Sequence, residues 1–295
     1  MKPARALLLI TLLASSASLP RADALADDSP TFPNENAITS LTPEAARKLL
    51  VQKGDNLSLS LGSLKTLDSA TAEVIAEFKG KVILLGGLTT LSADTARVLA
   101  AYDGMLLGLP RLTKLDAETA TELAKSKCKL LGLQGLKTLS ADTARQLAKY
   151  EGSVQVSGLT ELDAATAGEL AKFKCDKLSF ACLKAFDPAT AEALANFAGV
   201  LELGGITALD SPDAIVIAEA LAASRNAVDL PNLEKVSPKT LMALVRNDSV
   251  LIPPVGTLEL IPEPDGSLTE DCVMPQRFEE RQAELRGRIF LVSPE

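Results

Sequence analysis

The fold is decided by the stretch Leu107-Gly108-Leu109-Pro110-Arg111-Leu112-Thr113-Lys114-Leu115, which continues as Asp116-Ala117-Glu118-Thr119-Ala120-Thr121-Glu122-Leu123-Ala124. Similar stretches recur along the chain, and each aligns on its last apolar residue before the polar segment, which we call the anchor. The anchors are Leu41, Leu67, Leu91, Leu115, Leu139, Leu162, Phe186, Leu209 and Val236, most of them 23 or 24 residues apart. A period of this length indicates stacked supersecondary units, which form a solenoid.

Each copy begins with a pattern typical of a strand. Apolar residues stand eight, six and three positions before the anchor, as Leu59, Leu61 and Leu64 do before Leu67. The spacing of two predicts a β-strand with one buried face. The following spacing of three turns the chain out of the strand and across the layer.

A helix is predicted directly after each anchor. The next residue is an aspartate or a serine, whose side-chain oxygen accepts hydrogen bonds from the free amides of a first helical turn. These predicted N-caps are Asp68, Ser92, Asp116, Ser140, Asp163, Asp187, Asp210 and Ser237. The threonine, alanine and leucine columns that follow have spacings of three and four, which predict one buried helical stripe.

Two further columns complete the unit. Aromatic residues stand eleven positions after the anchor, at Phe78, Tyr102, Tyr150, Phe173 and Phe197, and we expect them to fill the core. Glycines stand thirteen positions after it, at Gly54, Gly80, Gly104, Gly152 and Gly199. Helices commonly end on a left-handed glycine, so we expect this conformation there.

The repeated order of strand, turn and helix predicts an α/β solenoid with a parallel sheet. Neighbouring strands lie about 4.8 Å apart, whereas packed helices need about 8 to 10 Å. The stack must therefore curve, with the parallel sheet on the concave side and the short helices on the convex side.

The pattern Leu-x-Leu-x-x-Leu-x-x-Leu resembles the leucine-rich repeat superfamily over about residues 38–260. The layout is most similar to the short, alanine-rich repeats of exported bacterial leucine-rich-repeat proteins. One departure is that leucine replaces the asparagine of the family signature, at Leu64, Leu88, Leu112, Leu136, Leu159 and Leu183. We therefore expect apolar packing, without an asparagine ladder, at that turn. The resemblance implies protein recognition on the concave face and supplies no catalytic residue.

The N-terminal residues 1–26 are predicted to be a signal peptide. Basic residues precede the apolar run 6–14, and small residues lead to a cleavage site after Ala26, with Ala17 as the alternative. A spanning helix needs about 20 apolar residues. We therefore expect export to the periplasm or the extracellular space, with no integral membrane span after cleavage; a retained anchor is the alternative.

The remaining chain is divided into three parts. Residues 27–37 are expected to be an extended leader, and residues 38–260 the solenoid, whose first unit has a helix but no clear strand. Residues 261–295 are expected to cap the last exposed unit, as open-ended stacks require. A disordered tail is the alternative.

The composition removes several kinds of chemistry. The chain has no histidine, which excludes Ser-His-Asp and Cys-His catalysis and histidine metal sites. Neither a zinc-type cysteine spacing nor a phosphate-binding glycine loop with its lysine is present. We therefore predict no enzyme, no cofactor and no metal; an enzyme that uses carboxylates is a minor alternative.

The net charge limits the classes of partner that we expect, and the cysteine positions limit the possible disulfides. The formal net charge is −8 without a basic cluster, so we expect no nucleic-acid partner. Cys128 and Cys175 lie two strands apart, about 10 Å, which exceeds the reach of a disulfide. We expect mostly unpaired, buried thiols, and Cys272 reaches another cysteine only if the tail folds back.

The candidate site is the outward face of the strands, nine and seven positions before each anchor. It is predicted to be apolar in the middle units and polar to acidic later, and its candidate partner-binding residues are Val82, Leu84, Leu106, Leu130, Gln155, Glu202 and Asp229. Exposed apolar clusters often mark contacts with another protein. The alternative is that the preceding loops cover these positions.

The sequence thus favours a non-catalytic exported scaffold that binds an unknown protein partner through its concave face. The alternative is a structural cell-envelope component that self-associates through its ends or its alanine-rich helical face.

Overall fold

The computed structural model describes residues 35–54, 56–263, 280 and 282–284. Its α-helices are α1 Pro43–Lys53, α2 Ser69–Ala76, α3 Ala93–Leu99, α4 Ala117–Leu123, α5 Ala141–Leu147, α6 Ala164–Leu170, α7 Pro188–Leu194, α8 Ala214–Ala222 and α9 Pro238–Leu244. Its strands are β1 Ser58–Ser60, β2 Val82–Leu84, β3 Leu106–Gly108, β4 Leu130–Gly132, β5 Ser153–Gln155, β6 Lys177–Ser179, β7 Val200–Glu202, β8 Ala208–Leu209, β9 Val228–Asp229, β10 Lys235–Val236, β11 Val250–Leu251 and β12 Glu259–Leu260. Two 3₁₀ helices are η1 Glu35–Ala37 and η2 Val255–Thr257.

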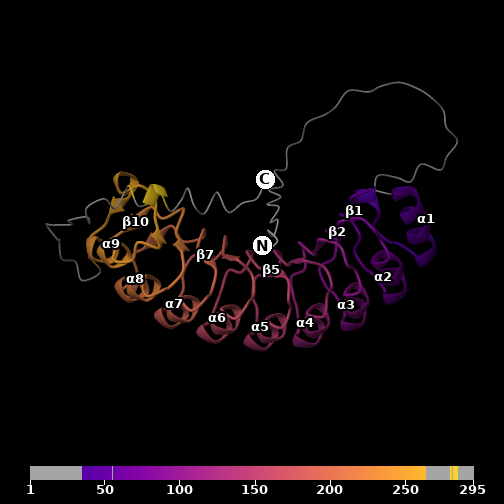
Figure 1. The fold of residues 1–295 in the computed structure, drawn as a ribbon, viewed down its shortest axis with the longest axis horizontal. Coiled ribbons are helices and arrows are strands. Elements are labelled where there is room, and N and C mark those ends of the chain that lie inside the picture. Colours follow the sequence, from indigo (N-terminus) through magenta and orange to yellow (C-terminus); the bar gives the residue numbers. More distant parts are fainter. Residues whose placement is uncertain (1–34, 55, 264–279, 281, 285–295) are drawn as a thin grey trace, which may run out of the picture.

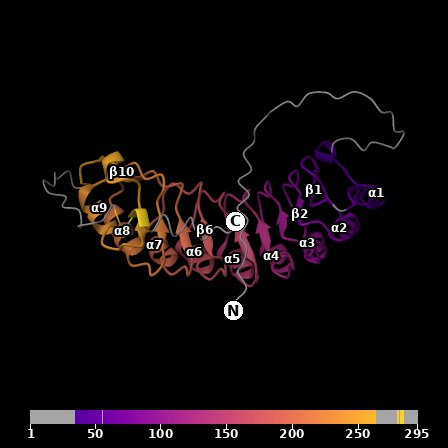
Figure 2. The same cartoon turned by 45° about the horizontal axis from the view of Figure 1, so that its top comes forward.

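The units stack into an arc, as the α/β solenoid prediction requires. Helices α1 to α9 lie side by side along its outer side, and the strands line the inner side (Figure 1). The tilted view shows the strands following one another along the stack (Figure 2). The predicted concave parallel sheet and convex helices are confirmed.

The sheet is divided into separate ladders. Strands β1 to β5 form one five-stranded sheet, and β6, β7, β9 and β11 form a four-stranded one. All the pairs are parallel. In the last units the anchor segments pair as well, as the ladder β8-β10-β12. The concave face therefore consists of two hydrogen-bonded halves that meet between β5 and β6.

The core lies where the periodicity places it. Leu107, Leu109 and Leu112, at eight, six and three positions before their anchor, are fully buried. The aromatic column is buried too, from Phe78 to Phe197. The prediction that both columns are buried in the core is confirmed.

The predicted N-caps form with one exception. The side chain of Asp163, for example, accepts a 2.7 Å hydrogen bond from the amide of Thr166. The prediction for Asp210 is wrong, because α8 begins only at Ala214, after Asp213. Ser211 precedes Pro212, and a residue before proline disfavours the helical region. The helix therefore starts later, and this unit is longer than its neighbours.

The glycine column has a different role from the one predicted. Within the described residues only Gly54 has a positive φ, at 49°. The left-handed expectation is therefore wrong for Gly80, Gly104, Gly152 and Gly199. A Cβ at Gly152 would lie 2.6 Å from the carbonyl oxygen of Lys129 and equally close to the ring of Tyr150. The absence of a side chain is needed for close packing on the preceding unit.

A column of buried threonines joins the units. The sequence pattern predicts these threonines only as part of the buried helical stripe. The hydroxyl of Thr166 donates a 3.3 Å hydrogen bond to the carbonyl of Leu139, the anchor of the preceding unit. The same bond runs from Thr71 to Leu41, Thr95 to Leu67, Thr143 to Leu115 and Thr190 to Leu162. This ladder adds polar links between units to the expected apolar packing.

The N-terminal end is closed by a short turn. Residues 35–37 form η1, so this part of the predicted leader is not extended. Asn36 Oδ1 accepts hydrogen bonds from Ser60 Oγ at 2.9 Å and from the Gly62 amide at 3.4 Å. Glu35 forms an ion pair of 2.5 Å with Lys53 of α1. The first unit has its predicted helix, α1, and the positions of a strand in this unit, residues 32–34, lie outside the described residues.

The C-terminal end is closed by side chains from beyond the repeats. Gln282 Nε2 donates to the carbonyl of Val250 at 2.8 Å, and Gln282 Oε1 accepts from the Ile252 amide at 3.2 Å. This amide group thus occupies the place of a further strand beside β11. Glu263 caps α9 by accepting from Ser237 Oγ and the Lys239 amide. Both contacts favour the predicted cap, although residues 1–34 and most of 264–295 lie outside the described residues.

Candidate functional site

The apolar half of the concave face is built by strand register. Val82 pairs with Leu106, and Leu106 with Leu130, so their side chains form one row across β2, β3 and β4. All three are partly exposed, while the next residue of each strand is buried. The row therefore faces away from the core and is partly exposed to solvent.

Leu84 adds a second row to this surface. It pairs with Gly108, which pairs with Gly132. A Cβ at Gly108 would lie 2.5 Å from Leu84 Cδ2, so the leucine side chain extends over the glycine. We call Val82, Leu84, Leu106 and Leu130 the apolar patch.

The polar half consists of side chains that bond to one another. Gln155, at the end of the five-stranded sheet, accepts a 2.6 Å hydrogen bond from Gln134. In the other sheet Glu202 forms an ion pair with Lys177 and accepts a 3.2 Å bond from Ser179. Asp229 of β9 lies next to Glu202 of β7 in the strand register. The predicted site residues are therefore divided between the sheets: Gln155 lies on the five-stranded sheet with the apolar patch, and Glu202 and Asp229 lie on the four-stranded one.

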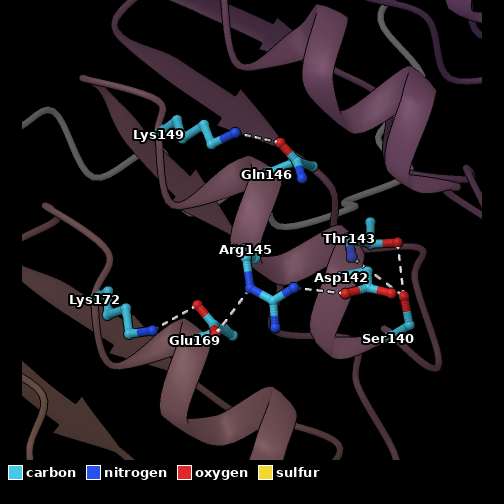
Figure 3. A network of polar contacts seen from close by, with 8 residues as sticks. All are labelled: Ser140, Asp142, Thr143, Arg145, Gln146, Lys149, Glu169 and Lys172. Carbon is cyan, nitrogen blue, oxygen red and sulfur yellow. Dashed lines mark hydrogen bonds and ion pairs between the residues drawn. The ribbon is translucent and has the colours of Figure 1, made fainter.

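The convex face carries an ion network that links neighbouring helices. Arg145 of α5 lies between Asp142, at 2.7 Å, and Glu169 of α6, at 3.2 Å, and Lys172 approaches Glu169 at 2.8 Å (Figure 3). Arg97, Asp94, Glu122 and Lys125 repeat the arrangement between α3 and α4. We call these the α3–α4 and α5–α6 ion networks.

These networks lower the pKa of their glutamates. The hydrogen bond from Lys172 and the nearby Arg145 hold the pKa of Glu169 below its usual value. Lys125 and Arg97 lower the pKa of Glu122 in the same way. Because every carboxylate of the two networks has a cationic partner, we interpret the networks as structural links between helices.

The thiols are placed in the interior. Cys128 and Cys175 are buried, and both are free, as is the partly exposed Cys182; Cys272 lies outside the described residues. Burial raises the pKa of Cys175 to about 11. A reactive thiol needs a lowered pKa and access to solvent, so Cys175 has the properties of a core residue.

The described residues form a small hollow at the start of α8. A cavity of about 120 Å³ lies where α8 begins late, and Phe186, Ile206, Leu209 and Ile217 line it. Ligand pockets usually measure about 300 to 1,000 Å³. Within the described residues no group of three or more histidine, cysteine, aspartate or glutamate side chains is arranged to hold a metal ion.

Comparisons with known proteins do not assign the chain to a family. No protein-family model matches the chain, and no curated protein matches it either. In the described part of the chain, every helix is too short or too polar to cross a membrane.

Proposed function

We propose that this chain is an exported, non-catalytic protein that recognises another protein through the concave face of its solenoid. Export, to the periplasm or the extracellular space, rests on the signal-like residues 1–26. Recognition rests on the concave surface, and the absence of histidine supports a role without acid and base chemistry. No cofactor is part of the proposal.

The observation that carries the proposal is the apolar patch. Its residues come from three consecutive strands in exact pairing, and they stay partly exposed although the positions beside them are fully buried. A monomer gains nothing from leaving such a row open to water. A partner that covers it would gain roughly 25 cal/mol for each Å² of apolar area buried.

The test uses Leu106→Asp together with Leu130→Asp. Wild-type and variant proteins are used as bait for affinity capture from the envelope fraction of the source cell, and circular dichroism checks the fold. Val216→Asp is the control, because Val216 is 50% exposed on helix α8, outside the patch. We expect the double variant to lose a specific partner and the control to keep it. Retention of the same partner by the double variant would contradict the proposal.

A second candidate is a structural envelope protein that self-associates. It is favoured by exposed apolar residues at the two ends of the stack: Leu57 before β1 is 63% exposed and Leu260 in β12 is 50% exposed. Sedimentation of wild type and of Leu57→Asp with Leu260→Asp distinguishes the two. Concentration-dependent oligomers that this variant abolishes would favour assembly, and a monomer at all concentrations would exclude it.

A further inference from the structure

A group of lysines borders the apolar patch. Lys81 stands directly before β2 and Lys129 directly before β4, and Lys79 and Lys127 stand two positions earlier. The strand register puts Lys81 and Lys129 two strands apart, which corresponds to about 10 Å. In a parallel sheet all strands begin at the same edge, so the four lysines gather at one edge of the patch.

These lysines are exposed and, within the described residues, have no ion-pair partner. In a later unit the lysines have acidic partners: Lys174, at the repeat position of Lys79 and Lys127, pairs with Glu151 at 2.6 Å, and Lys177, the first residue of β6, pairs with Glu202. In the three loops that lead into β2, β3 and β4, residues 77–81, 100–105 and 124–129, the acidic residues are the exposed Glu77 and Asp103. Positive charge is therefore in excess beside the patch.

We infer that the partner presents an acidic amphipathic segment, with apolar side chains for the patch and carboxylates for Lys81 and Lys129. This inference rests on the proposed function and names the chemistry of its partner. Complementary charges at the rim of an apolar contact provide specificity and fast association. Apolar side chains fill the centre, where charged residues are disfavoured.

Other anionic surfaces fit this site less well. The patch lies on the inner side of the arc, which a flat bilayer does not follow (Figure 1). A nucleic acid offers phosphates to the lysines but no aliphatic side chains to the patch. The net charge of −8 also opposes the approach of either extended polyanion. A protein segment supplies both kinds of contact at the scale of a few strands.

The experiment measures binding of a labelled probe peptide to the full chain by fluorescence anisotropy. The probe is a helix of about five turns with leucines along one face and glutamates beside them. A second peptide carries lysine in place of every glutamate. The protein variants are K81E/K129E and the matched control K114E/K137E, which changes the net charge equally at exposed lysines in the turns between strand and helix.

We expect the acidic peptide to bind the wild type, and its Kd to rise about tenfold in K81E/K129E. The control should stay within about twofold. The difference should shrink between about 0.05 M and about 0.5 M NaCl, because salt screens exposed charges.

The inference is overturned if the acidic peptide does not bind, if the lysine peptide binds equally well, or if both variants lose the same affinity. Tighter binding of anionic vesicles or duplex DNA through Lys81 and Lys129 would also overturn it. The proposed function is judged separately by Leu106→Asp with Leu130→Asp. If the leucine variant loses a partner that K81E/K129E still binds, the proposal of concave recognition stands and the inference of an acidic segment is wrong.

Discussion

One hydroxyl group joins each of five helices to the unit before it. The threonine side chain lies in the first turn of its helix, and it satisfies an anchor carbonyl that the turn leaves free. Buried carbonyls are almost always hydrogen-bonded. Leucine stands in this chain where the leucine-rich repeat signature has asparagine. The threonine column thus supplies polar links between units that an asparagine ladder does not provide here.

Thr166→Val tests this role with little change of shape. The valine leaves the partly buried carbonyl of Leu139 without its donor, so we expect a loss of about 1 kcal/mol of unfolding free energy. Urea denaturation provides the measurement. Thr138→Val, at an exposed position, should stay within about 0.5 kcal/mol. Equal stability of the two variants would show that the buried hydroxyl contributes nothing.

Two aspartates at the same repeat position should respond differently to alanine. Asp187 accepts a 2.7 Å hydrogen bond from the Thr190 amide, and Asp187→Ala should cost about 1 kcal/mol. Asp210 caps no helix because α8 starts at Ala214, so Asp210→Ala should be nearly neutral. Thermal unfolding of both variants checks the contrast, and a similar loss in both would mean that Asp210 does cap a helix.

At the scale of elements, helices are joined in pairs. The ion networks connect α3 with α4 and α5 with α6, whereas no ion pair joins α4 to α5 among their described residues. The cause is an alternation in sequence. Helices α3 and α5 carry the arginine, and α4 and α6 carry the glutamate that it meets.

The α5–α6 ion network predicts a pH dependence. The pKa of Glu169 is lowered by Lys172 and Arg145, so its contribution to stability is present above the ordinary value of 4.5 and is lost as the pH falls through the lowered one. We expect Glu169→Gln to lower Tm by about 2 °C at pH 7. At about pH 3 the two proteins should differ less. A constant difference across this range would contradict the ionic origin.

Most of the elements could be predicted because their signals are local. The buried positions before Leu115 and the cap at Asp116 follow from spacing and side-chain chemistry within one unit. The predicted start of α8 is wrong because it follows the repeat spacing and not the effect of Pro212 on the residue before it. The threonine bonds could not be predicted because the acceptor lies in another unit.

The same limit applies to the candidate site. The outward positions Val82, Leu106 and Leu130 could be predicted from alternation alone. The bordering lysines are dispersed in the sequence, so no basic cluster is visible until the register brings Lys81 and Lys129 to one edge. The division of the sheet between β5 and β6 is likewise a matter of three-dimensional pairing.

For the whole molecule, the closed ends should set where unfolding begins. Gln282→Ala removes the amide group that bonds to Val250 and Ile252, which leaves the last strand without a neighbour. Because each unit of a solenoid contacts only its neighbours, we expect faster hydrogen exchange in β11 and β9 and unchanged exchange in β2 to β4. Uniform acceleration along the stack would argue against such local closure.

The pairing of helices also decides how the arc can be shortened by engineering. Removing residues 98–145 joins Arg97 to Gln146 and places Asp94 and Arg97 opposite Glu169 and Lys172, so the charges still match. Removing residues 98–121 instead places Arg97 opposite Gln146, where it has no carboxylate to meet. Between α3 and α6 the units are therefore paired, and length variants that keep these pairs should tolerate truncation best.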